Sequence, residues 1–280
     1  MKHKKLWISL GIIGGVLLVV FVLCLTLFRV KNVTLDFASE TKYYNQDAQN
    51  ELLSQINVSK SIFTVNKKEL IQKIESQNEY IKVINIETVF PNGLVIHCTE
   101  RQELYVLKSE NNLFFVDEDF KILKITSNIG GLGQSIDDYL NARNLGDPIY
   151  LENIIIKNPG ATVGEFLDVQ ESEIIKNIYA SFFVNNRDIG ELKYMIKKIT
   201  LSHEMNYYTV HNEAVLTITL NNDFKTEIYL PKSNLNKKVQ IMLLSIAELS
   251  PEKFADYTLK IEENPENSKL FVNFVKKQST

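Results

Sequence analysis

The sequence predicts an α+β protein in three parts: an N-terminal transmembrane helix, a small β-α-α-β-β module, and a larger mixed β domain with two helices. Three observations support this prediction. The chain opens with an uncharged apolar run over residues 6–28. Alternating apolar residues, typical of strands, fill much of the remainder, and amphipathic helical stretches interrupt them. With 280 residues, 45% of them hydrophobic, the chain is long enough for a membrane segment and two compact domains.

The apolar run predicts a retained membrane anchor. A helix over residues 6–28 rises roughly 35 Å at ~1.5 Å per residue, which covers a hydrocarbon core of about 30 Å. The basic tail at residues 1–5 favours a cytoplasmic N-terminus, with the domains outside the cell. Two alternatives stay open. A cleaved signal peptide has a shorter apolar region and a small-residue cleavage site, and a lipoprotein at Cys24 needs a small residue where Leu23 stands.

The first external module, residues 29–101, follows the order β-α-α-β-β. The expected elements are a strand over 30–37, helices over 45–56 and 67–74, and strands over 81–90 and 94–101. Asn66 precedes the second helix and Glu69 stands three residues later, which is the spacing of a capping box. Apolar residues change phase within the strand over 81–90, so we expect a bulge or burial on both faces there.

The second module, residues 102–276, reads as short strands with two helices, followed by a short tail at 277–280. Strands are expected over 104–108, 113–116, 121–125, 149–156, 192–201, 207–211, 214–221, 225–230, 257–261 and 270–275. Helices are expected over 168–184 and 234–249, the second with a clear apolar stripe. The glycine-rich stretch over 127–148 reads as a loop, and no motif is visible between 127 and 191.

No motif predicts catalysis, a cofactor or a metal site. His203 and Glu204 begin like a zinc-binding helix, but the second histidine four residues later is missing. The stretch 117–120 is a turn rather than a calcium loop, because the ligand spacing is absent. We expect Cys98 to be a small core residue and His97 a surface residue of a strand. The net charge of −3 gives no basic field for nucleic acid, and no small-molecule substrate is expected.

Four stretches carry a family resemblance. They are VKNVTLDF (30–37), IFTVNKKELIQKI (62–74), YIKVINIETVFPNGLVIHCTER (80–101) and NLFFVDEDFKILK (112–124). Together with the anchor, they resemble the FtsQ/DivIB family of bacterial cell-division proteins. The resemblance implies that residues 29–101 form a POTRA domain and that a β domain follows it. Glu103 stands where the family often has a proline, and Asp36-Phe37 replaces its usual glycine, so the subfamily stays open.

The resemblance marks the last hairpin of the POTRA domain. In the family this hairpin carries an aromatic-proline turn, here Phe90 and Pro91, and ends in Glu-Arg, here Glu100 and Arg101. Two interpretations of the charged pair stay open: a solvated strand end, or an ion pair that locks the junction between the two domains.

The last strand, 270–275, predicts a partner site. A terminal strand is often a sheet edge, whose unpaired backbone groups can accept a partner's strand. The resemblance implies that this part receives small bitopic partners, FtsB/DivIC-like and, with them, FtsL-like. The residues expected to bind are Leu259, Ile261, Leu270, Val272 and Phe274. The alternative is a strand buried within its own domain.

The predicted function is a bitopic, non-enzymatic scaffold of the divisome. It would lie in the cell membrane at the division septum and link septal wall synthesis to division through protein contacts. One alternative is a membrane-anchored extracytoplasmic cell-wall enzyme, which needs a catalytic cluster that the sequence does not show. The other is a POTRA-type export or assembly module, which usually has several POTRA repeats or a barrel.

Overall fold

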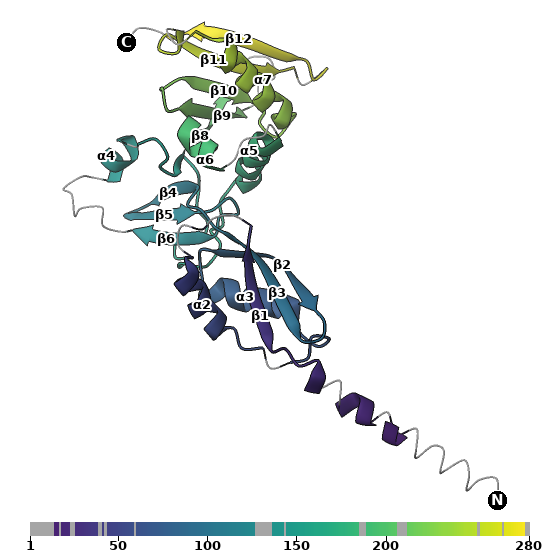
Figure 1. The fold of residues 1–280 in the computed structure, drawn as a ribbon. Helices are drawn as coiled ribbons and strands as arrows, with labels where there is room; N and C mark the ends of the chain where they lie inside the picture. Colours follow the sequence, from purple (N-terminus) through teal and green to yellow (C-terminus); the bar gives the residue numbers. More distant parts are fainter. Residues whose placement is uncertain are drawn as a thin grey trace, which may run out of the picture. The chain divides into compact units, whose positions relative to one another are not determined.

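The structure, a computed structural model, describes twelve stretches of the chain. They are residues 14–16, 18–22, 26–38, 41, 44–58, 60–126, 136–142, 144–184, 189–205, 212–250, 253–264 and 266–277. The chain divides into two compact units, Met1–Arg101 (unit 1) and Gln102–Thr280 (unit 2). Each unit has its own hydrophobic core, and Figure 1 shows their elements.

The structure tests the predicted transmembrane helix only over the residues that it describes. Within the described stretches, no helix combines the length and the apolar character needed to cross a membrane. Much of the predicted span, residues 6–28, lies outside the described residues. The span therefore stays a prediction from the sequence.

Residues 32–100 of unit 1 form a three-stranded sheet and two helices. Its elements are β1 (Asn32–Phe37), α2 (Gln46–Gln55), α3 (Lys67–Gln77), β2 (Ile81–Val89) and β3 (Gly93–Glu100). The strand order is β1-β3-β2, with β1 parallel and β2 antiparallel to β3 (Figure 1). The predicted β-α-α-β-β order is confirmed, and it is the order of a POTRA module.

Local signals explain why unit 1 forms these elements. The side-chain oxygen of Asn45 accepts the N–H of Ala48 at 3.0 Å and caps α2, and Asn66 caps α3 by accepting the N–H of Glu69 at 3.4 Å. Alternate residues of β3 are buried and pack with the buried faces of both helices. The expected bulge in β2 falls between Val83 and Asn85.

Unit 2 is built on one nine-stranded sheet. Its strands are β4 (Tyr105–Ser109), β5 (Asn112–Val116), β6 (Ile122–Thr126), β7 (Ile149–Glu152), β8 (Ile196–Met205), β9 (Asn212–Leu220), β10 (Lys225–Tyr229), β11 (Tyr257–Glu263) and β12 (Leu270–Lys276). The order in the sheet is β12-β11-β10-β9-β8-β7-β4-β5-β6. The last strand of the chain therefore lies at one end of the sheet (Figure 1).

Two longer helices, α5 (Ser172–Val184) and α7 (Leu235–Glu248), pack on this sheet and on each other. Val239 and Met242 of α7 are fully buried in the core that also holds Leu259 and Ile261 of β11. Burial of such side chains is worth about 1.5–3 kcal/mol each relative to exposure. The expected apolar stripe of this helix therefore belongs to the core of unit 2.

Unit 2 has more helices than the two that the sequence predicts. A short helix, α4 (Ile136–Asn141), lies within the stretch expected to be a loop, and α6 (Ile189–Met195) replaces the start of the strand expected from residue 192. Leu192 of α6 is buried in the core of unit 2, and Met195 packs against the same core. A helix of seven residues is too short to show clear periodicity in the sequence. The strand expected over 207–211 lies outside the described residues.

Candidate protein-interaction site

The turn between β2 and β3 of unit 1 carries an exposed aromatic residue, Phe90. Phe90 is 70% exposed, and the Phe90–Pro91 peptide bond is cis. Gly93 opens β3 directly after the turn, where a Cβ atom would stand 3.1 Å from the Cβ of Val89. The close approach of the two strands therefore favours glycine at this position.

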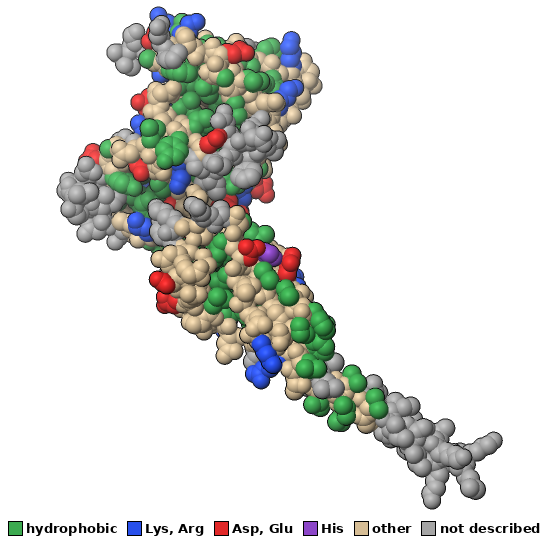
Figure 2. Space-filling model, viewed as in Figure 1, with side chains coloured by type: hydrophobic (Ala, Val, Ile, Leu, Met, Phe, Trp, Pro, Cys, Tyr) green, Lys and Arg blue, Asp and Glu red, His purple; other side chains and the backbone are tan. Residues whose placement is uncertain are grey.

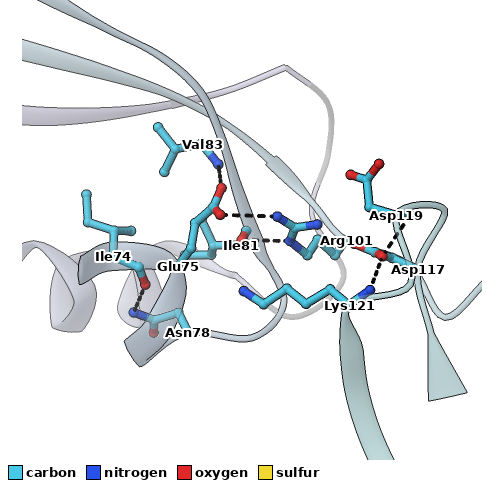
Figure 3. A network of polar contacts seen from close by, with 9 residues as sticks. All are labelled: Ile74, Glu75, Asn78, Ile81, Val83, Arg101, Asp117, Asp119 and Lys121. Atoms are coloured by element: carbon cyan, nitrogen blue, oxygen red, sulfur yellow. Dashed lines mark hydrogen bonds and ion pairs between the residues drawn. The ribbon is translucent and has the colours of Figure 1, made fainter. Parts of the chain in front are cut away.

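The other end of the hairpin carries a buried arginine. The Arg101 side chain is 3% exposed, its Nε donates to the Ile81 carbonyl at 3.1 Å, and its Nη2 lies 3.3 Å from Glu75 Oε2 of α3 (Figure 3). The other carboxylate oxygen of Glu75 accepts the N–H of Val83 at 2.8 Å. Arg101 therefore joins the end of β3 to α3 and β2 within unit 1.

This geometry corrects one interpretation of the Glu-Arg pair. Arg101 is not part of a solvated strand end, because its side chain is buried and paired, whereas Glu100 is half-buried. Successive residues of a strand point to opposite faces. The two charges therefore have different surroundings, and Arg101 forms an ion pair with Glu75 of α3.

The edge of unit 2 is the second candidate site. β12 pairs antiparallel with β11 along its whole length, with Phe274 opposite Leu259 and Val272 opposite Ile261. β12 is an edge strand of the nine-stranded sheet. Among the described residues, no strand of unit 2 pairs with its outer side.

The hydrogen bonds to β11 show which backbone groups of β12 face outward. Asn264 N–H donates to the Lys269 carbonyl at 2.9 Å, and Lys277 N–H donates to the Asp256 carbonyl at 2.7 Å. Opposite pairs in an antiparallel ladder alternate between bonded and non-bonded, and this register runs without a shift. The odd-numbered residues of β12 therefore bond to β11. The N–H and C=O groups of Leu270, Val272 and Phe274 point away from the sheet.

The five residues predicted to bind a partner fall into two groups. Leu259 and Ile261 are fully buried in the core of unit 2. Val272 is 39% exposed, Phe274 is 43% exposed, and Leu270 is half-buried. The three β12 residues lie on the sheet face that α7 covers, because directly opposite residues share a face. Only this second group offers both backbone and side chain at the surface.

A buried ion pair between α7 and β11 lies next to this edge, and the sequence did not predict it. Lys238 Nζ lies 2.6 Å from Glu263 Oε2, and both side chains are buried. Ser233 and Asn234 donate to the other oxygen of Glu263. Burial by itself raises the pKa of Glu263, but the hydrogen bonds from Lys238, Asn234 and Ser233 outweigh it and leave this pKa below its usual value. The sequence offered one sign of this ion pair: Lys238 stands directly before Val239, a residue of the apolar stripe of the helix.

The structure shows the surroundings of Cys98 and of the turn over 117–120. Cys98 is buried, and burial raises the pKa of its thiol to about 12, so it is a poor nucleophile. Asp117 accepts the backbone N–H groups of Asp119 and Lys121 at 2.9 and 2.8 Å (Figure 3). The carboxylate oxygens of 117–119 lie within 4.8 Å of one another, but one oxygen of Asp117 is used to close the predicted turn.

Comparison with known proteins supports the resemblance. Residues 45–101 match the family model of the POTRA domain, FtsQ-type. The chain is 26% identical over 150 residues to the cell division protein DivIB of Clostridium tetani, covering 53% of this chain and 54% of that protein. It is 35% identical over 71 residues to DivIB of Clostridium botulinum, covering 25% and 27% of the two chains. It is 32% identical over 79 residues to DivIB of Clostridium acetobutylicum, covering 28% and 31%.

The fold and the matched domain define an α+β protein with an FtsQ-type POTRA domain and a larger β-rich unit. The matched segments span about half the length of the C. tetani relative and less of the other two. These matches confirm the resemblance to the FtsQ/DivIB family of cell-division proteins.

Proposed function

We propose that this protein is a bitopic, non-enzymatic scaffold of the divisome. It is anchored in the cell membrane by residues 6–28, with both units outside the cell, and it acts at the division septum. The observation that carries the proposal is the outward-facing edge of β12 in a chain with an FtsQ-type POTRA domain. The names of the relatives, all cell division proteins, support the same process.

In this proposal a partner adds one strand to β12. Outward N–H and C=O groups at Leu270, Val272 and Phe274 are available for a ladder with that strand. About four to six hydrogen bonds contribute roughly 2–6 kcal/mol, at ~0.5–1.5 kcal/mol each. That affinity is modest. Two proteins anchored in one membrane meet at a raised effective concentration, which makes such an edge sufficient for assembly.

The chemistry of the edge indicates what the partner segment looks like. It would be extended, and its side chains on the α7 side would be apolar, because they would lie beside Val272 and Phe274. Lys276 follows at the end of β12 and disfavours indiscriminate pairing of this edge. FtsB/DivIC-like and FtsL-like proteins are the proposed partners.

A photocrosslinking experiment tests the proposal. A photoreactive phenylalanine replaces Phe274 in the full chain, expressed in dividing cells. We expect an adduct with a small single-span membrane protein, identified by mass spectrometry. The matched control is the same probe at Tyr194, an exposed aromatic residue of α6 in the same unit.

An adduct from Phe274 without one from Tyr194 supports partner binding at the edge. The proposal fails if Phe274 gives no adduct, or if both positions give the same adduct. Normal septation after depletion of the protein would separately contradict a role in division.

A further inference from the structure

Three segments meet at one end of unit 1, which we call the aromatic pole: residues 27–31, 60–64 and 89–93. Phe28 lies at its centre. The ring centroid of Phe28 is 5.1 Å from that of Phe63 and 5.2 Å from that of Phe90. Phe63 is 69% and Phe90 70% exposed. Phe28 itself is half-buried between them. Contiguous exposed apolar groups mark interaction sites, so the pole is a candidate interaction surface.

The backbone fastens the end of the apolar run to this pole. The Phe28 carbonyl accepts the N–H of Ile62 at 2.8 Å, and Val30 N–H donates to the Lys60 carbonyl at 3.1 Å. Lys31 N–H donates to the Asn92 carbonyl at 2.9 Å. Phe28 is thus the last residue of the apolar run and also part of the folded domain.

Exposed basic residues stand in or next to the three segments of the pole. The exposed cations of the pole and of the adjoining start of α3 are Arg29, Lys31, Lys60, Lys67 and Lys68. Glu69, an acidic residue beside them, lies 3.9 Å from Lys60. Figure 2 shows hydrophobic side chains gathered where the N-terminal segment leaves unit 1, with basic side chains nearby. This combination is complementary to a membrane surface with anionic headgroups.

We propose that the aromatic pole is a lipid-binding surface. Phe63 and Phe90 enter the interface of the bilayer, and the nearby cations lie among anionic headgroups. The inference rests on the proposed anchor at residues 6–28. Because the last residue of the anchor belongs to the pole, a spanning helix leaves the rings within a residue or two of the bilayer. Aromatic side chains at this depth would hold the POTRA domain in one orientation on the membrane.

Fluorescence quenching by brominated lipids tests the inference on the full chain. The sole tryptophan is first removed by Trp7→Phe, and a single tryptophan is then introduced as Phe63→Trp or Phe90→Trp. The protein is reconstituted into vesicles of phosphatidylglycerol and phosphatidylcholine whose acyl chains carry bromine near the glycerol end. We expect the emission of both variants to fall at least about threefold relative to unbrominated vesicles.

The matched control is Ile84→Trp in the same background. Ile84 is 59% exposed on β2 and stands six residues before Phe90, about 20 Å along an extended strand at ~3.3 Å per residue. Its tryptophan should keep most of its emission. All variants are also floated on a density gradient to measure membrane attachment independently.

The outcomes separate the two proposals. If the protein floats but residues 63 and 90 are quenched no more than residue 84, the lipid-binding pole is wrong and the anchor stands. If the protein does not float with vesicles, both are wrong. A photocrosslink from position 90 to a protein in cells, with no quenching in vesicles, would likewise overturn the lipid assignment in favour of a protein partner.

Discussion

The ammonium group of Lys238 can be buried because three oxygen acceptors lie within hydrogen-bond distance of it. Besides Glu263 at 2.6 Å, the carbonyl oxygens of Tyr229 and Leu230 lie 2.9 and 2.8 Å from Nζ. These contacts join the start of α7 to the ends of β10 and β11. Removal of one member of such a pair is costly, because the other charge stays buried without its partner.

The Lys238→Met variant should therefore destabilise unit 2 by about 3–5 kcal/mol. The measurement is amide hydrogen exchange in β10 and β11, read by mass spectrometry. Lys237→Met is the matched control, since Lys237 is exposed on the same turn of α7 and should change stability by less than ~0.5 kcal/mol. Equal protection in the two variants would show that the buried pair contributes no stability.

At the scale of elements, β12 has two different sides. Its odd-numbered residues bond to β11, and its even-numbered residues present their backbone groups at the edge. Neighbouring positions in one strand therefore serve different purposes: one holds the strand in the sheet, and the next is available to a partner. Proline can separate these roles because it removes a single backbone N–H.

We expect Val272→Pro to abolish the adduct formed from position 274 while leaving unit 2 folded. Asn273→Pro, one residue away, should instead free β12 from β11, because it removes an N–H directed into the sheet. Hydrogen exchange of β11 measures the fold, and adduct yield measures binding. An undiminished adduct in Val272→Pro would contradict strand addition at this edge.

At the scale of the whole molecule, the chain consists of two units with separate cores. Separate cores predict separate unfolding, so a defect in one core should not spread to the other. The protein should then fail the usual tests of two-state behaviour.

Ile96→Ala tests this expectation. Ile96 is fully buried in the core of unit 1, so the substitution should cost about 2–5 kcal/mol. Exchange should rise in β2 and β3 and stay unchanged in β8 and β9. Ile84→Ala, on the exposed side of β2, is the control. A parallel rise in both units would show that the chain unfolds as one cooperative body.

Much of unit 1 could be predicted because its signals are local. Asn45 and Asn66 cap helices through residues three positions away, and alternation in β3 directly reflects one buried face. The fate of Arg101 could not be predicted, because its partner Glu75 is 26 positions away in another element. The sequence also could not show that Leu259 and Ile261 belong to an inner strand. Alternating apolar residues occur both in inner strands and in edge strands.

The sequence by itself determined the POTRA order, the helix caps, the apolar run at the N-terminus and the resemblance to a cell-division family. These follow from periodicity and short-range chemistry, which need no knowledge of the fold. Only the tertiary structure decided that β12 is the edge while β11 is core, that Lys238 pairs with Glu263, and that Phe28, Phe63 and Phe90 meet at one pole. Each of these depends on contacts between residues far apart in the chain, and such contacts leave no periodic pattern in the sequence.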